Sequence, residues 1–185
     1  MQAAGKFSAA FCLWAALAVA PGQKTDHARS LAPFVPSPQH IVEKMLEAAQ
    51  VKPNETIFDL GCGDGRVLIT AARKFGARAV GVELSPNLAR TATEKIRKEG
   101  LEDRCKVIQG DLMEVDLSEA DVVVLYLLTS SNERLRPNLE KYLRPGARVV
   151  SHDYEIRGWK PARMESADAH NRRHTIYVYV MPSRK

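Results

Sequence analysis

The chain has 185 residues, of which 45% are hydrophobic and 26% charged, as is typical of one globular domain with a sizeable core. Its formal net charge is +5, but aromatic residues are few and do not alternate with basic ones, so we expect no nucleic-acid partner. The three cysteines, Cys12, Cys62 and Cys105, lie far apart, which indicates neither a disulfide framework nor a metal site. We therefore expect that the protein binds no metal ion. We also expect it to be a monomer.

The first 30 residues are expected to lie outside the domain. Lys6 precedes an apolar run from Phe7 to Ala20, which is shorter than the roughly 20 residues that span a bilayer comfortably. A basic start, a short apolar stretch and small residues near its end are typical of a signal peptide. An uncleaved anchor and a mis-assigned start codon stay open as alternatives. This segment favours a membrane-associated or exported protein.

From residue 31 onward, strand-like and helix-like patterns alternate. Ser37 and Pro38 predict the start of a helix, with Ser37 as its N-cap, that reaches about Gln50. Glycines at positions 76 and 100 are expected to end the next two helices. Apolar runs predict five strands, at residues 56–60, 78–84, 105–108, 121–128 and 147–153. Regular alternation of this kind is typical of right-handed βαβ units.

Polar and apolar residues alternate near the C-terminal end. Residues 175–181 are expected to form an amphipathic strand, residues 163–167 a shorter partner, and the polar residues 168–173 the turn between them. We therefore predict an α/β fold: a doubly wound, mostly parallel, seven-stranded Rossmann-like sheet with an antiparallel C-terminal edge hairpin. The sequence places this fold in one domain over residues 31–185.

A glycine-rich turn follows the first predicted strand. Gly61, Gly63 and Gly65 alternate with other residues, and glycines let the backbone approach a ligand closely. A dinucleotide site has the spacing G-x-G-x-x-G, whereas here the third glycine comes one position early. Asp59 and Asp64 flank the turn, and two carboxylates would repel a pyrophosphate. They suit a ligand that carries an amine and no phosphate, and S-adenosylmethionine is such a ligand.

Acidic residues also stand at the ends of the first three predicted strands. The carboxyl ends of parallel strands meet at one edge of a sheet, where ligands of such folds bind. We expect Asp59 to receive the ammonium group of the cofactor and Glu83 to accept both ribose hydroxyls. Asp111, or the amide of Leu112, is expected to recognise the adenine amino edge. Any one of these residues taken alone would more often be a helix cap.

The glycine turn at 59–66, together with residues 80–83 and 110–112, resembles the class I S-adenosylmethionine-dependent methyltransferases. The resemblance extends to one family, the protein-lysine methyltransferases whose mitochondrial members act on the ATP synthase c-subunit and the adenine nucleotide translocase, with their bacterial relatives. It covers about residues 33–182, and the following segments carry it: 33–36, 59–66, 125–128, 135–137, 145–150 and 158–161. Leu128-Thr129 departs from the proline seen in many relatives.

The resemblance implies transfer of a methyl group to a lysine side chain of a protein. A lysine amine has an unperturbed pKa of about 10.4, so it must lose its proton before it attacks the methyl group. A partly apolar entrance to the active site would lower that pKa. Tyr126 and Asp153, at the ends of two predicted strands, are our candidates for orienting the amine. His152 is a weaker candidate, because strand alternation would turn it to the opposite face from Asp153. Trp159 is expected to be a packing residue rather than a wall of the substrate site.

Two other functions stay open, namely a small-molecule methyltransferase and a non-catalytic S-adenosylmethionine-binding protein. The family has a hydrophobic segment before its domain, so the run from Phe7 to Ala20 fits an anchor of similar kind. The supply of S-adenosylmethionine argues for a domain that faces the cytoplasm, whereas the apolar segment favours a membrane-associated or exported protein. The sequence leaves this localisation open.

Overall fold

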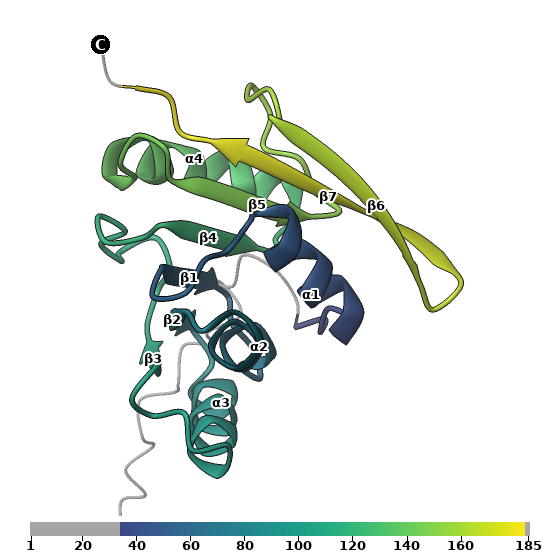
Figure 1. Cartoon of the computed structure of the whole chain (residues 1–185). Coiled ribbons are helices and arrows are strands. Elements are labelled where there is room, and N and C mark those ends of the chain that lie inside the picture. The colour runs from purple at the N-terminus through teal and green to yellow at the C-terminus, as the bar shows by residue number, and fades with distance from the viewer. Residues whose placement is uncertain (1–33, 184–185) are drawn as a thin grey trace, which may run out of the picture.

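The computed structural model describes residues 34–183 (Figure 1). The predicted signal-like or anchoring segment, residues 1–30, and its boundary with the domain lie outside the described residues. Within residues 34–183, the helices are too short or too polar to cross a bilayer.

Seven strands form one sheet in the order β3-β2-β1-β4-β5-β7-β6. β1 to β5 run parallel to one another, β7 pairs antiparallel with β5, and β6 pairs antiparallel with β7. The predicted fold class is confirmed, including the antiparallel hairpin at the C-terminal edge. The strands are β1 (Thr56–Leu60), β2 (Arg78–Glu83), β3 (Cys105–Gln109), β4 (Val122–Leu125), β5 (Arg148–His152), β6 (Arg163–Ala169) and β7 (Arg172–Val180).

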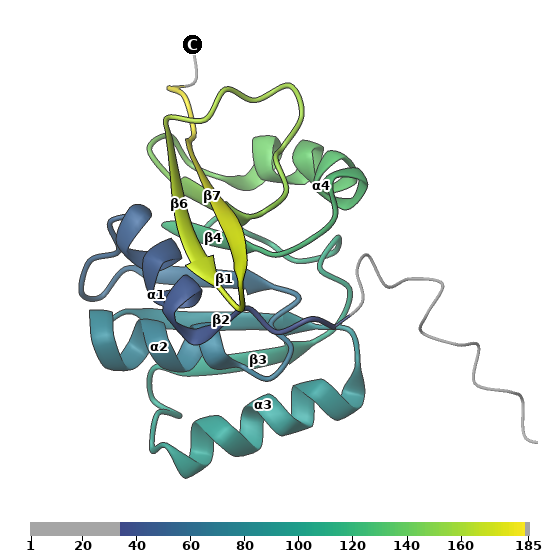
Figure 2. The same ribbon diagram turned by 90° about the vertical axis from the view of Figure 1, so that its right-hand side faces the viewer.

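Helices cover both faces of the sheet, but unequally (Figure 2). Residues of α1 (Gln39–Ala48), α2 (Arg66–Phe75) and α3 (Pro86–Lys98) pack on one face in a first apolar core. On the other face, α4 (Thr129–Tyr142) packs with the loops that follow β3 and β5 in a second core. The strands lie between these two cores, which explains why β4 reads as a continuous apolar run.

The helix ends follow local sequence rules in α2 and α3. Ser85 caps α3 by accepting a hydrogen bond from the Leu88 amide, with Pro86 at the first helical position, as predicted. Gly76 ends α2 in the left-handed conformation with φ of 66°. Both assignments depend only on neighbouring residues, so the sequence alone could supply them.

The predicted N-cap of α1 is wrong. Pro38 is the N-cap residue of α1 and makes no side-chain cap. The Ser37 hydroxyl lies 2.8 Å from Nδ1 of His152, a residue at the end of β5. A tertiary hydrogen bond has therefore replaced the local one, and it ties the segment before α1 to the far half of the sheet.

β4 and the hairpin turn also differ from the prediction. β4 ends at Leu125, so Tyr126 and Leu127 lie outside the strand, although the sequence predicted a strand as far as residue 128. The prediction was too long because an apolar run does not distinguish a buried strand from the buried loop that follows it. β6 and β7 are longer than predicted, and only His170 and Asn171 connect them, both with positive φ. Two left-handed residues make the tight type of hairpin turn that matches the twist of the strands.

Candidate functional site

The carboxyl ends of β1 and β2 bring the glycine turn and two buried acidic residues together. Asp59 is 5% exposed and Glu83 is 8% exposed. The Gly61 and Cys62 amides both donate to the carbonyl of Val82, so the turn is attached to the end of β2. The three sequence-predicted features of this edge therefore form one site.

The glycines of the turn hold conformations that other residues rarely adopt. Gly61, Gly63 and Gly65 have φ of 87°, 53° and 80°. A side chain at Gly63 would also collide with the ring of Phe34, which lies directly over the turn. Phe34 is 49% exposed, so it forms an outer wall of the site rather than part of the core.

Asp59 is a buried carboxyl group that lacks a cationic neighbour. Among residues 34–183, no hydrogen bond or ion pair reaches its side chain. Burial, with added repulsion from Glu83 and Asp64, raises the pKa of Asp59 to about 8. The site thus contains a buried acid that a cation would stabilise.

Glu83 supports the turn with both of its oxygens. One oxygen accepts the Gly63 amide at 2.9 Å, and the other accepts the Ser85 amide at 2.8 Å. A carboxylate has about four acceptor positions, so each oxygen of Glu83 keeps a lone pair for a ligand hydroxyl. Glu83 can therefore hold the turn and a ribose at the same time.

Asp64 is already paired within the protein. Its carboxylate forms ion pairs with Arg66 and Lys95, each at 2.8 Å. Burial opposes ionisation of Asp64, but these two cationic donors outweigh it and hold its pKa well below the usual range. Asp64 therefore fixes α2 and α3 beside the turn, and its charge is largely neutralised there.

The loop after β3 begins beside Glu83. The Gly110 amide donates to the Glu83 carbonyl at 3.0 Å, which places Asp111 and Leu112 next to the end of β2. The Asp111 carboxylate accepts the Met113 amide at 2.9 Å, and the partly buried Leu112 packs on the second core. The structure thus brings all the predicted cofactor residues to one edge of the sheet.

Tyr126 follows β4 at the same edge and stacks on His152. The two ring centroids are 3.9 Å apart, with an interplanar angle of 29°. Burial and the nearby Asp153 carboxylate raise the pKa of Tyr126, so its hydroxyl is neutral at physiological pH. This neutral hydroxyl can both donate and accept a hydrogen bond.

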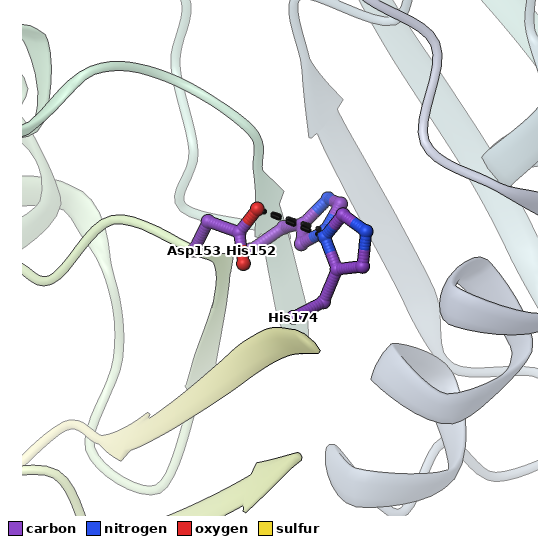
Figure 3. A group of neighbouring side chains, drawn as sticks. All are labelled: His152, Asp153 and His174. Carbon is purple, nitrogen blue, oxygen red and sulfur yellow. Dashed lines mark hydrogen bonds and ion pairs between the residues drawn. The ribbon is translucent and has the colours of Figure 1, made fainter. Parts of the chain in front are cut away.

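Asp153 does not lie on the opposite face from His152, contrary to the alternation that we expected. Asp153 follows β5 with φ of 61°, and alternation holds only inside a strand. Its carboxylate turns back toward His152 and His174 (Figure 3). Its oxygens accept hydrogen bonds from Arg172 at 2.6 Å and from the Thr175 amide at 2.9 Å, and Oδ2 lies 2.9 Å from His174 Nδ1.

His152 links this group to the segment before α1. It is fully buried, and burial lowers its pKa to about 4, so its ring is neutral. Its Nδ1 faces Ser37, and its Nε2 lies 2.9 Å from Nδ1 of His174. Sequence reasoning missed Arg172 and His174, because only the register of β7 against β5 brings them here. It also missed the tertiary contact of Ser37, which reaches His152 from the segment before α1.

A separate pocket lies at the opposite end of the sheet. Its volume is about 430 Å³, and Trp159, Tyr179 and Val180 are among the residues that line it. Val180 pairs with Arg148 at the start of β5, so this pocket is far from the carboxyl edge. Trp159 packs edge-on against Tyr179, as a core residue should, and donates to Glu140.

The chain is similar to known methyltransferases over most of its length. The family model described as the ANTKMT methyltransferase domain matches residues 59–163. A protein-lysine N-methyltransferase of Saccharolobus islandicus (strain REY15A) is 48% identical over 154 residues, covering 83% of this chain and 96% of that protein. The lysine N-methyltransferase of the ATP synthase c-subunit from Rattus norvegicus is 33% identical over 129 residues, covering 70% of this chain but only 59% of its own length.

A solved structure gives the same fold with a different described substrate. It is an RNA methyltransferase from Salinibacter ruber in complex with S-adenosyl-L-homocysteine. It is 44% identical, has a TM-score of 0.76 and covers 82% of this chain and 96% of its own. The similar structure thus carries the demethylated product of the cofactor that the glycine turn predicts.

Proposed function

The chain belongs to the ANTKMT methyltransferase domain family, and from that premise we propose that it methylates lysine side chains of a protein. It is an S-adenosylmethionine-dependent methyltransferase with the Rossmann-like fold of that family. The proposed lysine acceptor is supported by the 48% identity to a protein-lysine N-methyltransferase, and this is the observation that carries the proposal.

The residues at the carboxyl edge fit S-adenosylmethionine. The cofactor supplies a sulfonium methyl group for transfer to a nucleophile. The buried carboxyl of Asp59 has no partner among the described residues, and we assign it to the ammonium group of the cofactor. The glycines at 61, 63 and 65 let the turn adopt left-handed conformations that other residues rarely adopt, so its backbone can approach a ligand closely.

We assign the nucleoside part of the cofactor to the next two strand ends. Glu83 would accept the ribose hydroxyls on its remaining lone pairs, and Asp111 or the Leu112 amide would face the adenine. Asp64 would act indirectly, because Arg66 and Lys95 already hold its carboxylate. Phe34 would cover the amino-acid end of the cofactor from its position over Gly63.

We assign the orientation of the attacking amine to Tyr126. Its neutral hydroxyl can accept a hydrogen bond from the amine and leave the nitrogen lone pair directed at the methyl group. Positioning carries much of the rate in such a transfer, because no new charge has to be created. Asp153, the other sequence candidate, is not free to orient the amine itself, because Arg172 and His174 already contact its carboxylate.

An RNA acceptor is the competing hypothesis, because the similar Salinibacter ruber structure is described as an RNA methyltransferase. A small-molecule acceptor and cofactor binding without transfer are the remaining ones. The cofactor residues would be the same in every case, so only the acceptor distinguishes these functions.

A labelling experiment separates these functions. Full-length protein is incubated with a cell lysate and S-adenosylmethionine labelled in its methyl group, beside Asp59→Asn as the matched control. We expect label that protease removes and nuclease does not, and mass spectrometry should place it on lysine. Nuclease-sensitive label, label confined to small molecules, or no label above the control would refute a protein-lysine enzyme.

We propose further that the domain works at a membrane, faces the compartment that holds S-adenosylmethionine, and acts as a monomer. The apolar run from Phe7 to Ala20 supports membrane attachment. Fractionation of cells that express the full chain, followed by protease protection, tests whether the domain is attached to a membrane and which side it faces. A protein found only in the soluble fraction, or on the exported side of the membrane, would contradict these two proposals. Light scattering tests whether the protein is a monomer.

A further inference from the structure

We propose that His152, Asp153 and His174 bind one divalent transition-metal ion, with Zn²⁺ as the best match. The three side chains come from the end of β5 and from β7 (Figure 3). Two imidazoles and one carboxylate are a common ligand set for Zn²⁺, whereas Mg²⁺ and Ca²⁺ prefer oxygen ligands. This proposal goes beyond methyl transfer and does not depend on it.

The three ligand atoms already have the spacing of a metal site. His152 Nε2 and His174 Nδ1 are 2.9 Å apart, His174 Nδ1 and Asp153 Oδ2 are 2.9 Å apart, and His152 Nε2 and Asp153 Oδ2 are 3.5 Å apart. Ligands of a tetrahedral Zn²⁺ with bonds of 2.0–2.1 Å are separated by about 3.3 Å. One ion can therefore contact all three atoms after small shifts.

Hydrogen bonds alone do not satisfy this triangle of atoms. Nδ1 of His174 has either a proton or a lone pair, yet it lies equally close to His152 Nε2 and to Asp153 Oδ2. If Nδ1 is protonated, its single proton must be shared between two acceptors. If it is not, its lone pair opposes the carboxylate. A cation at the centre would let all three atoms direct lone pairs at one charge.

The outer contacts are those that metal ligands usually have. His152 Nδ1, on the far side of its ring, lies 2.8 Å from the Ser37 hydroxyl, which can accept a hydrogen bond from a protonated Nδ1. The second oxygen of Asp153 accepts the Thr175 amide at 2.9 Å. Such partners fix the ring orientation of ligating histidines and hold ligating carboxylates in place.

The backbone of Asp153 supports the same conclusion. Its left-handed conformation, with φ of 61°, turns the carboxylate toward the two histidines. Left-handed residues other than glycine carry a strain that functional sites often hold. Arg172 also contacts the carboxylate, but its side chain is 58% exposed, so it can move to solvent when a cation takes its place.

Zinc binding by the full-length protein tests the proposal. The purified protein is stripped with a chelator and dialysed against Zn²⁺, and its metal content is measured by plasma mass spectrometry. We expect one zinc per chain, a higher Tm with zinc, and no comparable response to Mg²⁺. His174→Gln and Asp153→Asn should each weaken zinc binding at least tenfold, and Ser37→Ala about tenfold through the outer contact.

His170→Asn is the matched control, because His170 lies in the same hairpin but is exposed and outside the cluster. This variant should bind zinc like the wild type. The proposal is overturned if the wild-type protein retains no stoichiometric zinc, or if His174→Gln retains as much as His170→Asn. Should His174→Gln fail to fold, Asp153→Asn and the wild-type stoichiometry decide the question.

Discussion

The two halves of the carboxyl edge are built in different ways. On the cofactor side, the turn between β1 and α2 and the ends of β2 and β3 supply carboxylates and backbone amides from short, contiguous segments. On the acceptor side, Tyr126 follows β4, His152 ends β5 and His174 lies in β7, and these residues meet Ser37 from the segment before α1. The first half is specified locally, whereas the second depends on tertiary register.

This difference predicts how each half responds to change. The cofactor half should fail when its backbone is displaced, because its ligand groups lie on one turn and two strand ends that backbone hydrogen bonds hold together. The acceptor half should lose rate while the cofactor still binds.

Gly81→Ala should disrupt the cofactor half most. A Cβ at Gly81 would lie 2.5 Å from Sγ of Cys62 and 2.7 Å from Cδ1 of Leu68, inside the packing behind the glycine turn. Overpacking of this kind costs about 1–3 kcal/mol, and we expect the upper end, with weaker cofactor binding. Gly110→Ala is the control, since its Cβ would meet only Ile108 at 4.0 Å. Urea denaturation compares the two, and equal stabilities would contradict the packing argument.

Tyr126→Phe should slow methyl transfer and leave cofactor binding unchanged. The substitution keeps the ring that stacks on His152 and removes only the hydroxyl proposed to align the amine. We expect kcat to fall about 10–100-fold, as for loss of one positioned polar group in a transition state. Kinetics with labelled cofactor measure kcat, and calorimetry measures the cofactor Kd. A Kd that changes as much as kcat would place Tyr126 in the cofactor half.

Cofactor affinity should rise with pH up to about 8. An ammonium group requires ionised Asp59, and the pKa of Asp59 in the folded protein is raised to about 8, chiefly by burial. Below that pH, binding must release a proton, so the affinity should fall about tenfold per pH unit. Titration between pH 6 and 9 measures this, and Asp59→Asn should lack the dependence. A wild-type affinity that does not change with pH would contradict the assignment.

Asp59→Asn should stabilise the protein without cofactor at high pH. The pKa of Asp59 is about 8 in the folded protein and about 3.9 in the unfolded chain, so its ionisation costs folding free energy progressively between about pH 4 and pH 8, and the cost is constant above pH 8. Removing the charge should therefore raise Tm by at least about 4–8 °C at pH 9 and by little near pH 4. Thermal melts at both pH values test this, and an equal change at both would exclude ionisation as the cause.

The sequence was sufficient where the structure depends on neighbours along the chain. The glycine spacing predicted the turn, Ser85 with Pro86 predicted the start of α3, and the alternation of strands and helices predicted the sheet. Parallel strands share one carboxyl edge, and this rule placed Asp59 and Glu83 together at the ends of their strands. Each of these inferences needed only local spacing and one topological rule.

The same reasoning could not predict the arrangement of the acceptor half, for physical reasons. Strand alternation failed at Asp153 because the strand ends one residue earlier and the backbone turns left-handed. Ser37 satisfied the pattern of a helix cap, yet its hydroxyl gained a buried tertiary partner instead. His174 shows no local pattern at all, and only the pairing of β7 with β5 places it beside His152.

Calorimetric titration of the full-length protein with S-adenosylmethionine tests directly whether the carboxyl edge of β1 and β2 binds the cofactor of a methyltransferase. We predict micromolar-range binding that Asp59→Ala and Glu83→Ala each weaken by at least about tenfold, through loss of a charged partner. Binding that neither variant weakens, or no binding by the folded wild-type protein, would contradict the account.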